Sequence, residues 1–263
     1  MKIKKNSAFT LIETMIALVI STIAVAAMYN AYLFFNKSYQ GLLDKAAISN
    51  AGRTSLSVIA KDLRNAGYKD MNYSRAFDRW IEQTDNYNTT GADSLVIWYN
   101  TSPTERLRIR YYLKKYPTGK EMFLAREVVE NPTNSPKLRH CERYKTQKNC
   151  EPQNIVPFVT DFQVVFKDVN GNELRPVCAD KRSVSNAAPS TPGCSTAGKA
   201  NQSKVHTAEV YLTVRSPNQI YKKNKIIKII NYNSSTGRQQ TITDRYHRET
   251  FYVSVYLRNI VKI

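Results

Sequence analysis

The sequence near the N-terminus lacks helix-breaking residues and, over a long stretch, charged residues. The 263 residues include only nine Gly and ten Pro, and none of these lies between Phe9 and Gln40. No charged residue occurs from Thr14 to Phe35. An apolar run of about 22 residues is long enough to cross a ~30 Å hydrocarbon core as a helix. These absences therefore predict a membrane-spanning helix near the N-terminus.

The motifs of common enzymes are also missing. The chain has no G-x-S-x-G elbow, no Gly-rich phosphate loop and no H-E-x-x-H helix. Its three histidines, His140, His206 and His247, have no evident nucleophile beside them in the sequence. We therefore expect that the protein is not an enzyme and binds no cofactor, and that it functions through contacts of its surface with partners.

Four cysteines are present, Cys141, Cys150, Cys178 and Cys194. An even number behind a membrane signal favours two disulfides in an oxidising compartment. Proximity predicts Cys141–Cys150 and Cys178–Cys194, one of three possible pairings, each closing a short surface loop. A zinc site is the competing interpretation, but there is no C-x-x-C pair and the histidines are scattered, so we expect no metal.

The N-terminus combines features that an ordinary signal peptide does not need. Lys2, Lys4 and Lys5 form a basic leader that favours the cytoplasmic side. Glu13 then stands at the start of the apolar run, where a buried carboxylate costs roughly 2.5 to 3.5 kcal/mol. An ordinary signal peptide, removed after the apolar stretch, and a plain membrane anchor are the alternatives. The missing breaker and the costly acid argue against the first.

The segment K-K-N-S-A-F-T-L-I-E, residues 4–13, resembles the class III signal of type IV prepilins. The resemblance implies cleavage between Ala8 and Phe9 by a prepilin peptidase, which also N-methylates Phe9. The family usually has Gly where this chain has Ala8, another small residue. By the same resemblance, Glu13 pairs with the N-terminal amine of a neighbouring subunit and sets the axial register. The alternative is that Glu13 reaches the lipid headgroups.

Beyond the apolar run, the pattern predicts an amphipathic continuation of the helix. Apolar residues recur at steps of three and four, which favours one packed stripe. Asn65-Ala66-Gly67 is a plausible helix end, with Gly67 past the last turn. The stripe comprises Leu42, Leu43, Ala46, Ala47, Leu56, Ile59, Ala60 and Leu63.

The remaining residues read as an antiparallel β domain. Residues 94–99 are apolar and β-branched, and residues 106–113 alternate between an apolar face and an arginine face. Residues 155–169 and 208–216 also alternate, and Asn170-Gly171 is a two-residue hairpin signal. A calcium loop at residues 168–173 is disfavoured because no Glu completes its spacing. The arginine row of residues 106–110 is expected to be a solvated face.

The charge balance is strongly basic. The formal net charge is +18, and loss of the three leader lysines leaves 18 − 3 = +15. Such a charge favours anionic surfaces, acidic proteins or nucleic acid as partners. A solvated basic surface with no partner is the alternative, because the basic residues are spread widely.

Three further segments resemble the PilW family of minor pilins: I-A-K-D-L-R-N-A-G-Y at 59–68, A-E-V-Y-L-T-V-R-S at 208–216, and the strand ending in L-R-N at 245–259. The resemblance implies an α+β, pilin-like fold, with one long N-terminal helix packed on a mainly antiparallel β-sheet. Its parts are a leader (1–8), a transmembrane half-helix (9–35), an amphipathic half-helix (36–66) and a periplasmic β domain (67–263).

The function implied is that of a minor pilin that primes type IV pilus assembly at the filament tip. Its partners are other minor pilins, the major pilin, the prepilin peptidase and the inner membrane, and the mature chain moves from that membrane to the pilus. A type II secretion pseudopilin of the GspJ type shares the signal and architecture and stays open. A basic pilin that binds DNA or another anionic surface is the third alternative.

Overall fold

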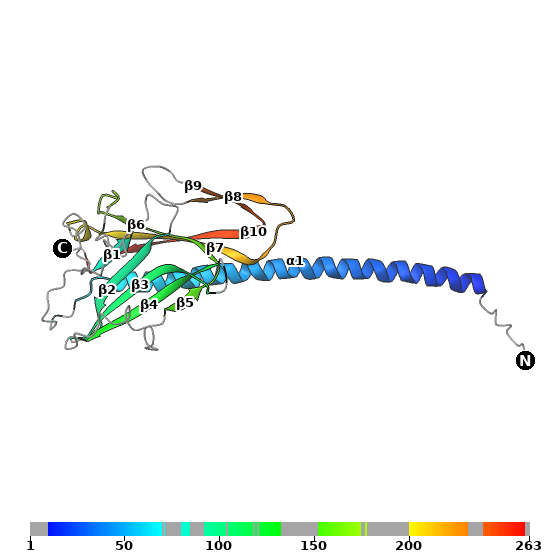
Figure 1. The fold of residues 1–263 in the computed structure, drawn as a ribbon, viewed down its shortest axis with the longest axis horizontal. Helices are drawn as coiled ribbons and strands as arrows, with labels where there is room; N and C mark the ends of the chain where they lie inside the picture. Colours follow the sequence, from blue (N-terminus) through cyan, green and yellow to red (C-terminus); the bar gives the residue numbers. More distant parts are fainter. Residues whose placement is uncertain are drawn as a thin grey trace, which may run out of the picture. The chain divides into compact units, whose positions relative to one another are not determined.

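The computed structural model describes residues 10–69, 71, 80–84, 92–103, 105–117, 119, 121–132, 152–174, 177, 200–230 and 239–260. The chain divides into two compact units, Met1–Ala46 and Ala47–Ile263. One helix, α1 (Leu11–Asn65), runs through both, and the strands belong to the second unit. The expected α+β class, with a long N-terminal helix and antiparallel sheets, is confirmed (Figure 1).

The strands form three antiparallel sheets rather than one. The first has the order β1-β2-β3-β4-β5 and the second the order β10-β7-β6, while β8 and β9 pair as a separate hairpin. The bounds are β1 Ile81–Thr84, β2 Ser94–Asn100, β3 Glu105–Lys115, β4 Met122–Pro132, β5 Gln153–Val156, β6 Val159–Lys167, β7 Thr207–Gln219, β8 Lys225–Ile230, β9 Gln239–Asp244 and β10 Tyr246–Tyr256.

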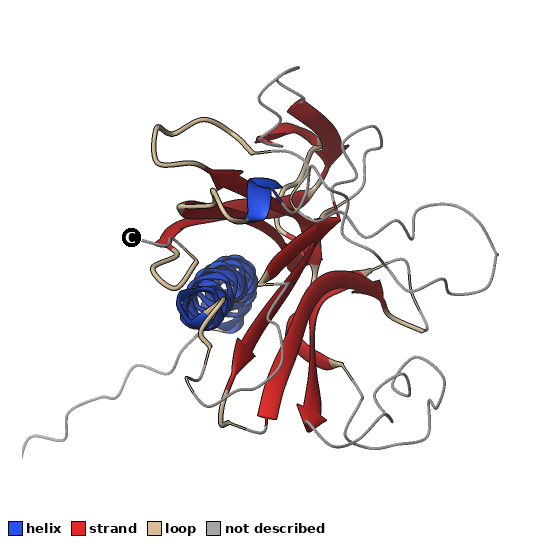
Figure 2. Cartoon of the chain, turned by 90° about the vertical axis from the view of Figure 1, so that its left-hand side faces the viewer, coloured by secondary structure: helices blue, strands red, loops and turns tan. Residues whose placement is uncertain are grey.

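The core of the second unit lies between the two larger sheets and the last turns of α1 (Figure 2). Ile59 and Leu63 of the helix are fully buried, as are Ile109 of β3 and Leu212 of β7. The packed stripe of α1 begins at Ile48, so the predicted stripe is right from Leu56 onward. Its first members are wrong: Leu42 and Leu43 are 63% and 50% exposed, and Ala46 and Ala47 are exposed too. The spacing of apolar residues indicated which face of the helix packs, but not the residue at which its packing on the β domain begins.

Polar side chains join the two sheets behind this core. The Asp93 carboxylate accepts a hydrogen bond from the Val164 amide at 2.9 Å, and the Asp93 amide donates to the Phe162 carbonyl at 2.8 Å. The Gln83 side-chain amide donates to the Val164 carbonyl at 2.6 Å. Because β6 is thereby tied to the segment entering β2, the two sheets keep a fixed relation along this seam.

Gly52 allows β10 to approach the helix. A Cβ added to Gly52 would overlap the ring of Phe251, which packs directly against the helix backbone. Sequence propensity shows only the cost of this glycine, about 1 kcal/mol relative to Ala in a helix. The structure shows its reason, which is the space that the aromatic ring occupies.

We expect Gly52→Ala to destabilise the second unit by about 1 to 3 kcal/mol, because overpacking outweighs the better helix propensity of Ala. Urea unfolding of the full chain in detergent, followed by tryptophan fluorescence, measures the change. Ser57→Ala, at an exposed position of the same helix, is the matched control and should be near neutral. Phe251→Val in the Gly52→Ala background should recover part of the loss, and additive effects of the two changes would contradict the steric explanation.

The predicted segment 155–169 is not one strand. It divides at Pro157-Phe158 into β5, which belongs to the first sheet, and β6, which belongs to the second. Phe158 has a φ of 57°, an uncommon conformation for a bulky residue, and it makes the corner between the sheets. The Phe158 carbonyl accepts a hydrogen bond from the Arg215 amide at 2.9 Å, which holds that corner. The near alternation of apolar residues hid the break, although Pro157 was a visible signal.

The Asn170-Gly171 prediction is also corrected. The isolated bridge between Lys167 and Glu173 encloses a five-residue turn, and only Gly171 adopts a positive φ, of 82°. The Asp168 carboxylate accepts the backbone amides of Asn170 and Asn172, each at 2.8 Å. These donors make Asp168 the organiser of the turn, as the turn interpretation of residues 168–173 predicted.

Asp161 is a buried acid whose negative charge destabilises the fold. It is 4% exposed in β6, and burial raises its pKa despite a 3.0 Å hydrogen bond from the Gln163 side chain. A raised pKa means that the folded chain binds more protons than the unfolded chain above pH 3.8, so stability falls as pH rises through the folded pKa.

We therefore expect Asp161→Asn to raise the free energy of unfolding at pH 7, with the gain disappearing as pH falls below about 3.8. Urea titrations at several pH values measure it. Asp168→Asn is the opposite control, because hydrogen bonds from Asn172 lower the pKa of Asp168. A gain for Asp161→Asn that is independent of pH would contradict charge burial as the cause.

Candidate assembly site at the start of the helix

The first described residues form a helix cap around Glu13. The Thr10 amide and hydroxyl both donate to Glu13 Oε2, at 2.8 and 2.9 Å, and the Glu13 amide donates to Thr10 Oγ1 at 3.3 Å. This reciprocal pair is a capping box, in which a Thr and a Glu three residues later satisfy the free amides of the first turn. The T-x-x-E spacing inside F-T-L-I-E was a readable signal of it, and our sequence reasoning overlooked it.

Glu13 therefore has a local partner in the isolated chain. Its carboxylate is still exposed, and its pairing with a neighbouring amine remains a prediction. Ala8 and Phe9, the predicted cleavage and methylation residues, lie outside the described residues. The same holds for Cys141, Cys150, Cys178 and Cys194, so both disulfides remain predictions.

The apolar run after Glu13 presents its side chains outward. Every residue from Leu11 to Gln40 is exposed in the chain, including the adjacent rings of Phe34 and Phe35. The helix is long and apolar enough to cross a membrane. Since water is a poor solvent for so many adjacent apolar side chains, this half of α1 needs lipid or other helices around it.

The arginine row of β3 is only partly solvated. Arg106 and Arg108 lie over the ring of Trp98, with guanidinium carbons 4.5 and 5.7 Å from its centroid, and Arg110 lies 4.6 Å from the centre of Tyr112. All three arginines are half-buried. The alternation of β3 is confirmed, since Ile109 and Tyr111 on the other face are buried.

An ionic cluster ties the end of α1 to β3 and β4. Asp62 Oδ2 accepts hydrogen bonds from the Tyr111 hydroxyl and from Arg126 Nε at 3.0 Å. Arg126 Nη2 lies 3.0 Å from the same oxygen. Burial and the adjacent Asp62 charge raise the pKa of Tyr111, which keeps its hydroxyl a donor. This cluster was not predicted.

The described histidines contact aromatic rings. The His206 ring lies 4.5 Å from that of Tyr256, and His247 Nδ1 lies 2.9 Å from the Tyr221 hydroxyl. Among the described residues, no group of His, Cys, Asp and Glu is arranged to hold a metal ion. His140 lies outside the described residues.

Comparison with known proteins gives likenesses of two kinds, to a family model and to a solved structure. The family model of the prokaryotic N-terminal methylation motif matches residues 3–29. A type IV-like pilin from Thermus thermophilus has a similar solved structure, with 13% sequence identity and a TM-score of 0.49 over 82% of this chain and 100% of that chain. A search of curated proteins gives no match. The chain thus carries a methylation motif that ends within the apolar half of α1.

Proposed function

We propose that this chain is a minor pilin of a type IV pilus, of the PilW kind, that helps to prime assembly at the filament tip. The observation that supports it best is the methylation motif at residues 3–29, which overlaps the exposed, apolar first half of α1. A prepilin peptidase cleaves between Ala8 and Phe9 and methylates Phe9. The chain then waits in the inner membrane, with its β domain in the periplasm.

The mechanism is mechanical rather than catalytic. The apolar half of α1 leaves lipid for a bundle of like helices, and packing among these helices replaces contacts with lipid. Glu13 pairs with the amine of methylated Phe9 on a neighbouring subunit, which sets the axial register. The partners are other minor pilins and the major pilin. The basic β domain remains outside the bundle.

The first experiment determines the mature N-terminus by mass spectrometry of the membrane-extracted protein. The expected N-terminal residue is N-methylated Phe9, and deletion of the peptidase should restore residues 1–8. A mature N-terminus beyond Phe35 would mean an ordinary signal peptide and would overturn the proposal. Co-purification with pilus subunits rather than secretion pseudopilins then tests the system to which the chain belongs.

A further inference from the structure

Five lysines gather at one end of the unit Ala47–Ile263. They come from the end of β3, from the connection between β7 and β8 and from the first residue of β8, and all are exposed. Within the described part of the chain none forms an ion pair, and Lys225 lies 4.1 Å from the centre of the Tyr221 ring. We call this set the basic end: Lys114, Lys115, Lys222, Lys223 and Lys225.

Contacts along α1 locate the basic end. Asn259, just after β10, donates to the Arg64 carbonyl at 2.9 Å near the end of the helix. Phe251, earlier in β10, packs on Gly52, so β10 runs in the same direction as α1. The first residue of β10 therefore lies beside the point where α1 enters this unit, at Ala47. That residue is paired with Gln219, the last of β7, and the lysines of residues 222–225 follow directly.

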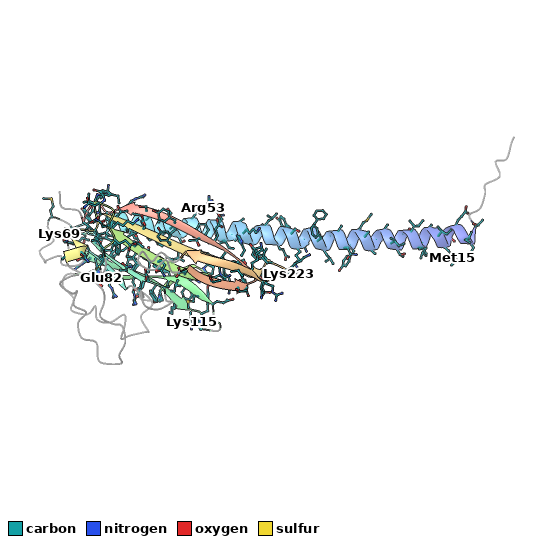
Figure 3. All side chains as sticks on the ribbon, turned by 90° about the horizontal axis from the view of Figure 1, so that it is seen from above. Met15, Arg53, Lys69, Glu82, Lys115 and Lys223 are labelled. Atoms are coloured by element: carbon teal, nitrogen blue, oxygen red, sulfur yellow. The ribbon has the colours of Figure 1, made fainter. Side chains whose placement is uncertain are left out.

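The β3–β4 connection lies at the same end. Glu121, the residue before β4, binds Arg215 of β7 with an oxygen–nitrogen distance of 2.8 Å. Figure 3 shows Lys115 and Lys223 toward Arg53, while Lys69 and Glu82 lie at the other end of the unit. Both groups of lysines thus belong to the end through which the chain arrives from its apolar half.

The acids at this end already bind arginines. Glu121 is paired with Arg215, and the two carboxylate oxygens of Asp244 accept from Arg248 at 2.6 and 2.7 Å. Asp244 lies opposite Lys225 in the β8–β9 ladder, but it is engaged by this two-point contact. The lysines therefore keep their positive field, and Ile226 beside them is 70% exposed.

We propose that the basic end binds the anionic phospholipid headgroups of the membrane that holds α1. This inference rests on the membrane anchoring in the proposed function. Only residues 36–46 separate Phe35, the last residue of the apolar run, from Ala47, and as helix they span about 17 Å. So short a connection allows the basic end to reach the headgroups, whose field decays over about 8 Å at physiological salt. Each lysine at an anionic surface strengthens binding about fivefold.

The test uses the full chain in nanodiscs of phosphatidylcholine with or without phosphatidylglycerol. Lysine acetylation by a soluble reagent, read by mass spectrometry, reports how accessible each amine is. In anionic discs the five lysines of the basic end should react about fivefold more slowly, and high salt should restore their rates. Lys61, Lys69 and Lys204, exposed elsewhere in the same unit, should react equally in both discs.

Two charge-matched variants sharpen the test. Lys222→Glu/Lys223→Glu/Lys225→Glu should abolish the protection of Lys114 and Lys115, whereas Lys61→Glu/Lys69→Glu/Lys204→Glu should leave it intact. Equal rates in both discs, with the chain co-eluting with the discs, overturn the docking alone. A chain that does not co-elute with discs overturns the anchoring as well. Protection by added single-stranded DNA but not by lipid assigns the basic end to nucleic acid and overturns the proposal.

Discussion

Glu13→Ala is expected to lower incorporation into the minor-pilin complex and the pilus by two orders of magnitude or more. The mutant should remain inserted in the membrane, because the change makes the helix more apolar. In the filament, the partner amine would lose its counter-charge, and breaking a buried pair costs roughly 3 to 5 kcal/mol. Each 1.4 kcal/mol is about tenfold in an equilibrium. Co-purification with partner subunits and counts of surface pili measure the loss.

The capping box provides a second explanation that must be separated from the first. Thr10 and Glu13 satisfy each other's groups at the helix start, and loss of such a cap costs about 0.5 to 2 kcal/mol. Glu13→Gln removes the charge but keeps a side chain that can complete a capping box. If the charge sets the register, this variant should fail to assemble as Glu13→Ala does.

Thr10→Ala is the matched control, since it weakens the cap and retains the carboxylate. We expect it to assemble nearly as the wild type does. Normal assembly of Glu13→Gln together with failure of Thr10→Ala would assign the role to capping and remove the register role from Glu13. Normal assembly of Glu13→Ala would remove both.

Arg126→Ala is expected to destabilise the second unit by about 3 kcal/mol. The Asp62 side chain is 6% exposed and that of Arg126 is 20% exposed, so the mutation leaves a buried carboxylate without its cation. The loss should fall at the lower end of the 3 to 5 kcal/mol typical of such pairs, because the Tyr111 hydroxyl still donates to Asp62. Urea unfolding of the full chain in detergent, with its cysteines unchanged, measures it.

A variant in which both Asp62 and Arg126 are neutral separates the effect of an unpaired buried charge from the effect of lost packing. Asp62→Asn/Arg126→Met removes the two charges and keeps most of the volume, so it should cost clearly less than Arg126→Ala. Tyr111→Phe removes the hydroxyl that donates to Asp62 and accepts from Arg126 Nε at 3.2 Å, and it should cost about 1 to 2 kcal/mol. A double variant as unstable as Arg126→Ala would mean that shape, and not charge, is what Arg126 contributes.

The local elements of this protein were readable because their patterns are local. The uncharged run of residues 14–35, the alternation of β3, and Gly67 past the helix end were identified from the sequence. The structure gives Gly67 a φ of 76°. The alternation of side chains along a strand and the need for glycine after a helix both follow from the backbone conformation of a few adjacent residues. Such features can therefore be predicted without knowing any distant contact.

Part of the candidate assembly site was also local. The processing segment and Glu13 were recognisable by resemblance, and the T-x-x-E spacing of the cap lies within four residues. By contrast, the Asp62, Tyr111 and Arg126 cluster joins residues separated by 49 and 64 positions. The residues that flank Arg126 do not distinguish it from the other arginines, because it contacts Asp62 only once β4 has packed against the helix.

Three features were decided by the tertiary structure alone. The sequence determined that residues 155–169 are apolar and extended, but the corner at Phe158 assigns them to two sheets. It determined that Gly52 weakens a helix, but only the packing of Phe251 explains why the glycine is there. It determined that the chain is basic, while the parallel course of β10 along α1 and the Glu121–Arg215 ion pair bring lysines of β3 and lysines that follow β7 to one end. The spacing of apolar residues along a helix or strand determines which of its faces is buried. Which backbones approach closely, and which charged side chains cluster, depends on how elements distant in the sequence pack together.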